Sequence, residues 1–378
     1  MDARNTPVVE VDQLSERLPA GATLPASWYT SKSIFHQETR TIFSRYWQYA
    51  CRLDEVARPG DYLACRAGNI PVVVLRNHSD ELAAFVNVCR HRGAEVVLDG
   101  SRGNRHTLQC HYHGWTWGLD GSLRAAPGAE NEPCFRNEQF FLTPLGVGLL
   151  GPFIFVRPDS HAPGWQETIG ELPPALLASP SPLAALLFRE RRTYDMRANW
   201  KIVVENFLEC YHCAIAHKGF ADLIDLKAYT ITPHRYCSVQ RGPLKSSAGT
   251  RADAACFLKE DGGQEGIYNY VWPNFMVNLY PGYANASTNL ILPVAPDRTL
   301  AIYDFYFEEG IDEADSMVAF IDQVQQEDIV ICESVQRGLS SGFYDQGRLV
   351  LRYENGIQHF QRLVLEALTR EDRREGPQ

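Results

Sequence analysis

The sequence predicts an α+β protein, with a small all-β domain inserted into a larger domain of helices and antiparallel strands. Between Trp47 and Arg157, short runs rich in β-branched and aromatic residues alternate with turns of Gly, Asn and Asp, a pattern typical of strands. After Pro158, stretches with the helical spacing of apolar residues flank probable strands. We therefore place the all-β domain at 45–157 and assign 1–44 and 158–378 to the larger domain.

Each element rests on local patterning. We expect a helix at about 33–46 and strands at 62–66, 70–76, 82–88 and 153–157. A Pro-rich stretch follows at 173–182. In the larger domain we expect helices at about 200–216 and 313–338, and between them a strand with alternating aromatics, Tyr268, Tyr270 and Trp272, and a strand at 300–307.

Composition excludes several classes of protein. The 378 residues carry a net charge of −10, so a broad electrostatic surface for nucleic acid or an anionic membrane is not expected. No apolar run approaches the ~20 residues that span a bilayer, and the first residues are polar, so we expect a cytoplasmic protein. Ten cysteines in a chain of this length suggest metal ligands or buried thiols more than a disulfide framework.

The first constellation is Cys89-x-His91, then eighteen residues, then Cys110-x-x-His113. Two thiolates can hold one iron of a 2Fe–2S cluster and two imidazoles the other. Replacing two thiolates by neutral imidazoles raises the reduction potential of the cluster above that of one held by four cysteines. A Cys2His2 zinc site is the alternative, although this spacing differs from that of the common finger. Four unrelated core residues are the other alternative.

This constellation resembles the two cluster loops of the Rieske ferredoxin domain. The matching segments are Cys89-Arg90-His91-Arg92-Gly93-Ala94 and Cys110-His111-Tyr112-His113-Gly114-Trp115, with the family's hairpin at Leu119-Asp120-Gly121-Ser122-Leu123. The sequence departs from the family in having His111 where Pro is usual and in its long gap between the loops. The resemblance implies a 2Fe–2S cluster held by Cys89, His91, Cys110 and His113, and leaves His106 and His111 outside the ligand set.

The second constellation is Glu209, His212 and His217. On the expected helix Glu209 and His212 lie on one face, whereas His217 is off that face by roughly 140°. Both imidazoles can reach one metal only if the helix bulges or ends between them. Two His and one carboxylate with open positions form the facial triad of non-haem Fe(II) oxygenases.

The third ligand is expected on the late helix. Asp328 lies within an apolar stripe of Ile321, Val324, Ile331 and Val335, and a carboxylate on a core face is costly unless it is paired or bound to metal. Asp328 is therefore our choice and the neighbouring Glu327 is second. An ion pair with an arginine is the alternative.

The segment from Asn199-Trp200-Lys201 to His217 resembles the catalytic motif of Rieske oxygenase alpha subunits. That resemblance implies a helix-grip (START-like) catalytic domain and a mononuclear Fe(II) held by His212 and His217. It gives Glu209 the place of the carboxylate that bridges the cluster of one subunit to the iron of its neighbour. It also implies a head-to-tail homotrimer, O2 as co-substrate and a separate NAD(P)H-dependent reductase. The segment from Glu327-Asp328 to Leu339 resembles the part of the family that carries the third ligand.

A short sequence motif predicts the class of substrate. Glu209-Cys210-Tyr211-His212-Cys213 resembles the branch that oxidises quaternary ammonium compounds such as carnitine and betaines. Aromatic faces bind such cations, and the catalytic half offers Tyr268, Tyr270, Trp272, Phe275, Tyr280, Tyr283, Tyr303 and Phe305, although any one of them can equally be a core residue. An aromatic-ring hydroxylating dioxygenase or aromatic O-demethylase is the runner-up, and a Rieske electron carrier is the non-enzyme alternative.

Two further patterns are set aside. Gly146 to Gly151 fits G-x-G-x-x-G but precedes a strand and not a helix, so we interpret it as a β-turn with no dinucleotide site. Cys210 and Cys213 are expected to pack in the helix and not to form a redox pair.

Overall fold

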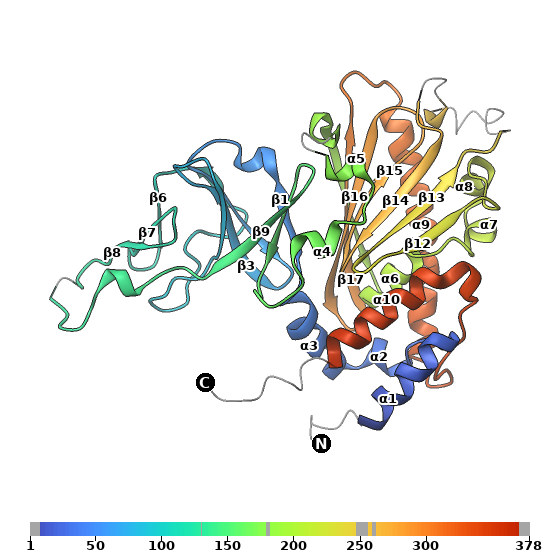
Figure 1. Ribbon diagram of the computed structural model, residues 1–378, viewed down its shortest axis with the longest axis horizontal. Coiled ribbons are helices and arrows are strands. Elements are labelled where there is room, and N and C mark those ends of the chain that lie inside the picture. Colours follow the sequence, from blue (N-terminus) through green and yellow to red (C-terminus); the bar gives the residue numbers. More distant parts are fainter. Residues whose placement is uncertain (1–7, 130, 179–181, 247–255, 259–261, 370–378) are drawn as a thin grey trace. The chain divides into compact units, whose positions relative to one another are not determined.

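The structure, a computed structural model, describes residues 8–129, 131–178, 182–246, 256–258 and 262–369. The chain forms two compact units (Figure 1). The smaller is Phe43–Trp165, and the larger is built from the chain before and after it. The larger unit is therefore discontinuous in sequence, and the smaller one is an insertion within it.

The smaller unit is all-β in its regular structure. One antiparallel sheet has the order β1-β10-β9-β4-β3-β2-β5 and a second has the order β6-β7-β8. The strands are β1 (Gln48–Arg52), β2 (Asp61–Ala67), β3 (Ile70–Arg76), β4 (Leu82–Val86), β5 (Arg102–Asn104), β6 (Thr107–Gln109), β7 (Thr116–Gly118), β8 (Leu123–Ala125), β9 (Pro144–Leu150) and β10 (Phe153–Arg157), with 3-10 turns η3 (Leu53–Val56) and η4 (Asn137–Gln139). The four strands expected from the sequence are present as β2, β3, β4 and β10.

Strand β3 shows why this unit has two cores. Its run of consecutive apolar residues alternates between the two faces of the sheet. Val73 and Leu75 enter one buried cluster, which also contains Cys89 and Cys110. Val72 and Val74 enter the other. The two cysteines are therefore anchored in a packed core.

The Gly-rich segment differs from its interpretation as a β-turn. Gly146 and Gly148 lie within β9, and only Gly151, with φ 55°, is in the turn to β10. Gly148 is needed for packing, since an added Cβ would come within 2.5 Å of the Trp165 ring. The absence of a following helix was the informative part of the pattern.

The larger unit is built on a seven-stranded antiparallel sheet of order β11-β17-β16-β15-β14-β13-β12. Its strands are β11 (Leu187–Met196), β12 (Thr230–Pro233), β13 (Cys237–Pro243), β14 (Glu265–Val271), β15 (Phe275–Leu279), β16 (Asn285–Ala295) and β17 (Arg298–Phe307). Its helices are α1 (Val8–Arg17), α2 (Ser27–Thr30), α3 (Lys32–Glu38), α4 (Trp165–Ile169), α5 (Pro174–Leu177), α6 (Trp200–Phe207), α7 (Cys213–Ala216), α8 (Lys218–Leu223), α9 (Ala314–Leu339) and α10 (Leu351–Thr369). Three short turns complete the list: η1 (Leu18–Ala20), the π-helical η2 (Thr39–Phe43) and η5 (Pro182–Ala185).

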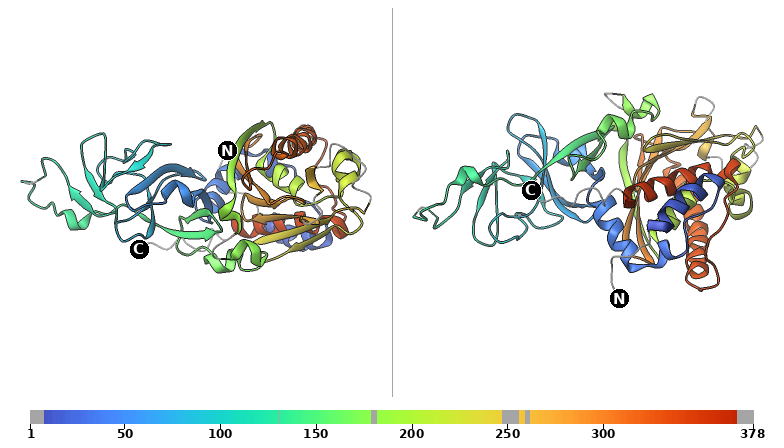
Figure 2. Two further views of the ribbon diagram at one scale, coloured as in Figure 1. Left: turned by 90° about the horizontal axis from the view of Figure 1, so that it is seen from above. Right: turned by 60° about the horizontal axis from the view of Figure 1, so that its bottom comes forward.

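Helices α6, α9 and α10 pack against strands of this sheet (Figure 2). On α9, Asp322 accepts a hydrogen bond from Tyr194 of β11 at 2.6 Å, and Gln325 accepts one from Tyr303 of β17. These bonds fix the helix over the sheet, so that Asp328, three residues after Gln325 and on the same face of α9, faces the same interior.

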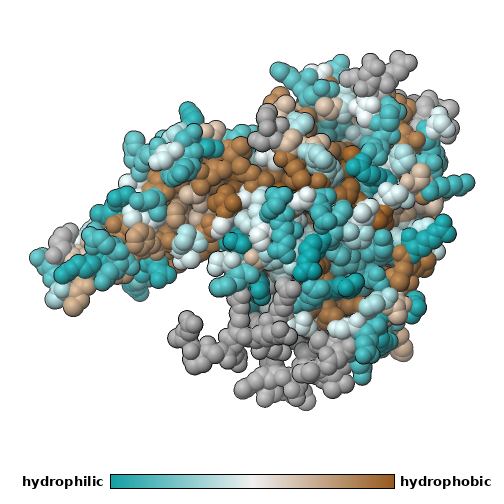
Figure 3. Space-filling view, viewed as in Figure 1, coloured by the Kyte–Doolittle hydropathy of each residue, from teal (hydrophilic) through white to brown (hydrophobic). Residues whose placement is uncertain are grey.

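The helix predictions have mixed outcomes. The late helix is present as α9, close to its expected bounds. The expected helix at 33–46 is α3 followed by a π-helical turn, and the expected helix at 200–216 is broken into α6 and α7. None of the helices in the described ranges is long and apolar enough to cross a membrane. On the face of the smaller unit shown in Figure 3, hydrophobic side chains gather in a patch that polar side chains surround.

Candidate functional site

Two loops of the smaller unit bring together the first four predicted ligands. Cys89 and Cys110 are buried at 2% exposure each, whereas His91 and His113 are exposed. The two imidazole rings lie 4.5 Å apart between centroids, nearly perpendicular to each other. Burial and the adjacent Cys110 raise the pKa of the Cys89 thiol, because two thiolates side by side need a cation to be stable.

The two loops have the same pattern of backbone hydrogen bonds. The Cys89 N–H donates to Ala94 at 2.7 Å and the Gly93 N–H donates to Cys89 at 3.0 Å. In the second loop the Cys110 N–H donates to Trp115 at 2.8 Å and the Gly114 N–H donates to Cys110 at 3.0 Å. Gly93 and Gly114 both have φ near 75°, a conformation that strongly favours glycine. Two inner thiols and two outer imidazoles on paired loops fit a 2Fe–2S cluster.

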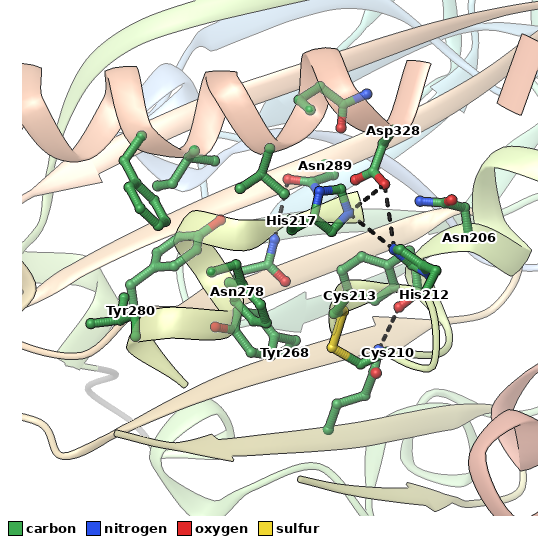
Figure 4. A pocket seen from close by; sticks show the side chains of 18 of the residues that line it. Asn206, Cys210, His212, Cys213, His217, Tyr268, Asn278, Tyr280, Asn289 and Asp328 are labelled. Atoms are coloured by element: carbon green, nitrogen blue, oxygen red, sulfur yellow. Dashed lines mark hydrogen bonds and ion pairs between the residues drawn. A yellow bond between two sulfur atoms is a disulfide. The ribbon is translucent and has the colours of Figure 1, made fainter. Parts of the chain in front are cut away.

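In the larger unit, three of the predicted ligands converge on one point (Figure 4). His212 Nε2 lies 3.0 Å from His217 Nε2, and Asp328 Oδ1 lies 2.9 Å from His217 Nε2 and 3.5 Å from His212 Nε2. One ligand atom from each of the three residues lies within 4.8 Å of the others. Two imidazoles and a carboxylate in this arrangement suit a non-haem Fe(II) with open positions.

The other ring nitrogen of each histidine is held by a carboxylate. His212 Nδ1 pairs with Glu209 Oε1, and His217 Nδ1 pairs with Glu327 Oε2 at 2.7 Å. Such partners fix the tautomer and orientation of metal-binding histidines. Glu327, the second choice for third ligand, therefore contacts the opposite side of the His217 ring from Asp328.

These carboxylates favour positive charge at the site. Burial alone would lower the pKa of His212, but Asp328 and Glu209 outweigh it and raise the pKa to about 10. The same balance, with Asp328 and Glu327 as partners, raises the pKa of His217. Burial opposes ionisation of Asp328, yet the two histidines hold its pKa below the usual value. The donor set is thus matched to a cation.

The helix that was expected to carry Glu209 and His212 ends before either residue. Helix α6 stops at Phe207, whose carbonyl accepts a hydrogen bond from Gln240 at 2.7 Å. At this point helix α10 approaches closely, since a Cβ on Gly356 would lie 2.3 Å from the Leu208 carbonyl oxygen. The prediction of one helical face was therefore wrong.

A turn replaces that helical face. The second oxygen of Glu209 accepts from the backbone N–H groups of Tyr211 and His212. The single turn α7 then separates His212 from His217. This turn, and not a bulge in a continuous helix, brings both Nε2 atoms together.

Cys210 and Cys213 also differ from expectation. They form a disulfide with a Cα–Cα distance of 5.0 Å, and Cys210 lies outside any helix. The prediction that they pack in the helix without forming a redox pair was wrong. Their C-x-x-C spacing was the available signal.

A pocket opens beside the three convergent ligands, and its lining includes a group of Phe and Tyr side chains. Of the eight aromatic residues named from the sequence, three line it: Tyr268, Tyr280 and Tyr303. Four are core residues, namely Tyr270, Trp272, Phe275 and Phe305, and Tyr283 is half-buried outside the lining. The sequence reasoning missed the other aromatic lining residues, Phe207, Phe220, Tyr229, Phe257 and Phe320. They lie on helices, turns and loops outside the strands where the search was made.

Comparison with known families agrees with both centres. Residues 46–136 match the Rieske [2Fe-2S] domain, and residues 183–370 match the ring hydroxylating alpha subunit, catalytic domain. The chain belongs to the Rieske oxygenase family of alpha subunits. The family, the α+β fold class and the oxidoreductase activity predicted from the two motifs are therefore confirmed. Membership implies a 2Fe–2S cluster and a mononuclear iron in this oxygenase, with a separate reductase and a small-molecule substrate.

Curated relatives extend over nearly the whole oxygenase. It is 34% identical over 353 residues to the carnitine monooxygenase oxygenase subunit of Acinetobacter pittii, covering 90% of this chain and 94% of that protein. It is also 34% identical over 350 residues to the chloroplastic choline monooxygenase of Spinacia oleracea, covering 89% and 76%. Two relatives that are equally identical to this chain are thus named for two chemically related substrates.

Solved structures give the same result. A quaternary ammonium Rieske monooxygenase in complex with L-carnitine superimposes with a TM-score of 0.76 at 31% identity, covering 92% of this oxygenase and 95% of that chain. Naphthalene 1,2-dioxygenase from Rhodococcus sp. superimposes with a TM-score of 0.73 at 18% identity, covering 95% and 99%. The second likeness shows a common fold alone.

Proposed function

We propose that this oxygenase is the terminal component of a monooxygenase that oxidises a quaternary ammonium compound. The observation that carries the proposal is the pocket itself, in which aromatic side chains surround a space that ends at His212, His217 and Asp328. Aromatic faces attract a quaternary ammonium, by ~2 kcal/mol or more when the cation is desolvated. Relatives named for carnitine and choline support the same substrate class.

The proposal assigns a role to each of the predicted site residues. Cys89, His91, Cys110 and His113 hold the 2Fe–2S cluster, and His212, His217 and Asp328 hold a mononuclear Fe(II). The iron supplies the O2 chemistry that side chains lack. Glu209 orients His212 and connects the site to the cluster of a neighbouring subunit in a head-to-tail trimer. The pocket residues position the substrate and exclude water.

The proposal also covers the domain boundaries and the location in the cell. The segment 45–157 is the electron-receiving domain, and 1–44 with 158–378 form the catalytic domain. A separate NAD(P)H-dependent reductase delivers electrons one at a time, which suits a cytoplasmic location.

Two measurements test the proposal. Iron analysis should find about three irons per chain, since a 2Fe–2S carrier without the second site holds about two. With a competent reductase, O2 uptake should be stimulated by trimethylammonium compounds and not by aromatic acids. Stimulation by aromatic acids alone would instead support the aromatic hydroxylase.

A further inference from the structure

One polar atom in the pocket wall has no partner in the described structure. Asn278 on β15 is 2% exposed, and its Oδ1 accepts no hydrogen bond from the protein. It lies between Tyr268 on β14 and Ser287 on β16, its direct neighbours across the sheet. Figure 4 shows Asn278 beside Tyr268 and Tyr280, on the side of the pocket that leads to His217.

The rest of the amide is fully used. Asn278 Nδ2 donates to Ser287 Oγ at 3.1 Å and to Asn289 Oδ1 at 3.3 Å. Ser287 Oγ also bonds the Tyr280 hydroxyl at 2.9 Å. With Asn289 Oδ1 accepting from both Asn278 and Ser287, the Asn278 amide presents its nitrogen to this network and its oxygen away from it. Oδ1 is therefore the atom of this lining amide that no protein group satisfies.

Two glutamines of the pocket wall have partners for both ends of their amides. Gln240 accepts from the Tyr229 hydroxyl at 3.1 Å and donates to the Phe207 carbonyl. Gln325 accepts from Tyr303 and donates to a methionine sulfur. Among the lining residues that the structure describes, Asn278 Oδ1 is thus the buried side-chain oxygen or nitrogen without a partner. A buried acceptor left unpaired is unfavourable, so a donor on the ligand is favoured there.

The charges in the pocket restrict the rest of the ligand. No lysine or arginine occurs among the described lining residues, and the ionisable acids there are Glu209 and Asp328. Away from the metal site, a ligand carboxylate would be desolvated without a lysine or arginine to pair with, which is unfavourable. A ligand cation, in contrast, can contact a cluster of three aromatic rings. In this cluster the ring centroid of Tyr268 lies 5.9 Å from that of Tyr280 and 6.1 Å from that of Phe220.

We propose that Asn278 Oδ1 accepts a hydrogen bond from a substrate hydroxyl, and that the substrate is a quaternary ammonium alcohol without a carboxylate, as choline is. This inference rests on the proposed function and narrows it. The hydroxyl satisfies the unpaired acceptor, the trimethylammonium group contacts the aromatic rings, and no carboxylate has to be neutralised.

The test is a panel of four ligands that differ in two groups. Choline has the hydroxyl alone, ethyltrimethylammonium has neither group, carnitine has both, and γ-butyrobetaine has the carboxylate alone. Dissociation constants are measured by calorimetry on the iron-loaded protein, anaerobically and without reductant, so that no turnover occurs. Choline should bind at least about tenfold more tightly than ethyltrimethylammonium, the difference expected for an unpaired buried acceptor. Choline should also bind more tightly than carnitine.

A pair of variants assigns the effect to one atom. Asn278→Leu keeps the approximate volume of the side chain and removes the acceptor, so the preference for choline over ethyltrimethylammonium should fall to about twofold or less. Asn269→Leu is the matched control: Asn269 is equally buried with an unpartnered Oδ1, but it lies on β14 outside the pocket lining. That variant should retain the preference.

The outcomes separate the two proposals. Equal binding of choline and ethyltrimethylammonium by the parent protein, or tightest binding of a carboxylate ligand, would overturn this inference and leave the quaternary ammonium oxygenase intact. Failure of all four ligands to bind, with binding of aromatic acids, would overturn the proposed function itself. The panel needs only the parent protein, so it remains decisive if Asn278→Leu does not fold.

Discussion

Glu209 lies beside His212 as the sequence predicted, but for a different structural reason. The sequence placed it on one helical face with His212, and the contact between the two side chains is present. The geometry comes instead from a turn whose backbone N–H groups bond the same carboxylate. Spacing of three residues brings side chains together in a helix and in such a turn alike, so the sequence could not distinguish them.

Changing Glu209 to Gln should therefore separate iron binding from electron transfer. The amide keeps an acceptor but loses the charge, so we expect the cluster and most of the mononuclear iron to remain. Reoxidation of the pre-reduced cluster, on adding O2 and substrate in a single turnover, should slow markedly. Glu209→Asp keeps the charge with a shorter reach and should be milder. Reoxidation at the wild-type rate in Glu209→Gln would eliminate the bridging role.

Glu205 is a second acid whose surroundings set its chemistry. Its carboxyl accepts hydrogen bonds from the Tyr29 hydroxyl at 2.7 Å and from Gln361 at 3.0 Å. Burial nevertheless dominates and raises its pKa to about 7. Because the folded state holds this proton more tightly than the unfolded chain, Glu205 lowers stability as the pH rises from about 4.5 to 7, with no further loss above that range.

We predict that Glu205→Gln stabilises the protein in a pH-dependent manner. The amide can accept both hydrogen bonds without ionising, so the gain should be small near pH 5. It should be complete above pH 7, at no more than about 3 kcal/mol. The measurement is the difference in Tm between the variant and the parent at pH 5 and at pH 8. Equal differences at the two pH values would show that ionisation of Glu205 is not the cause.

At the scale of the element, the sequence predicted the start of helix α6 correctly but placed its end too far along the chain. Asn199 caps it by accepting from the Lys201 N–H at 3.0 Å, a local signal that the sequence displays. Lys201 and Glu38 form a buried ion pair, and Trp200 donates to the same carboxylate at 2.8 Å. The early end depends on Gly356 of α10, far along the chain. Such tertiary causes are absent from any local pattern.

Helix α9 was predicted more successfully because its apolar periodicity is long. The stripe was imperfect, since Val335 is 43% exposed while Cys332 and Gln336 are buried. Asp328 nevertheless faces His212 and His217. The sequence could not assign the neighbouring Glu327, because its role as partner of His217 appears only when the two segments meet.

Substitutions at these two acids of α9 should have different effects. Asp328→Asn should remove the mononuclear iron and turnover while the Rieske spectrum remains. Glu327→Gln should keep the iron site but weaken its affinity by roughly 10- to 100-fold, as is typical when a histidine loses its orienting partner. Iron titration followed by EPR measures both. Loss of iron in Glu327→Gln with retention in Asp328→Asn would reverse the assignment.

At the scale of the whole molecule, the discontinuous arrangement could be anticipated because the change in patterning is abrupt at both ends of the all-β segment. The chain forms one unit from Phe43–Trp165 and another from the flanking segments. The pocket could not be anticipated in the same way. Its lining comes from α6, α7, α8, α9, the five neighbouring strands β13 to β17 and the segments between them. Asn278 is an ordinary strand residue until its neighbours across the sheet are known.

The head-to-tail trimer that we propose leads to a final prediction, because in it the two centres that exchange electrons belong to different subunits. Cys110→Ala should lack the cluster and keep the mononuclear iron, and His212→Ala should keep the Rieske spectrum and lack that iron. Each variant should be inactive alone. Co-expressed with different tags, they should form mixed trimers in which a cluster of one subunit adjoins an intact iron site of the next. For random mixing in a closed head-to-tail ring, about a quarter of such junctions are functional, so about a quarter of the wild-type activity per subunit should return. Mixed trimers that are isolated through both tags and remain inactive, although each variant keeps its own intact centre, would show that electrons do not cross between subunits.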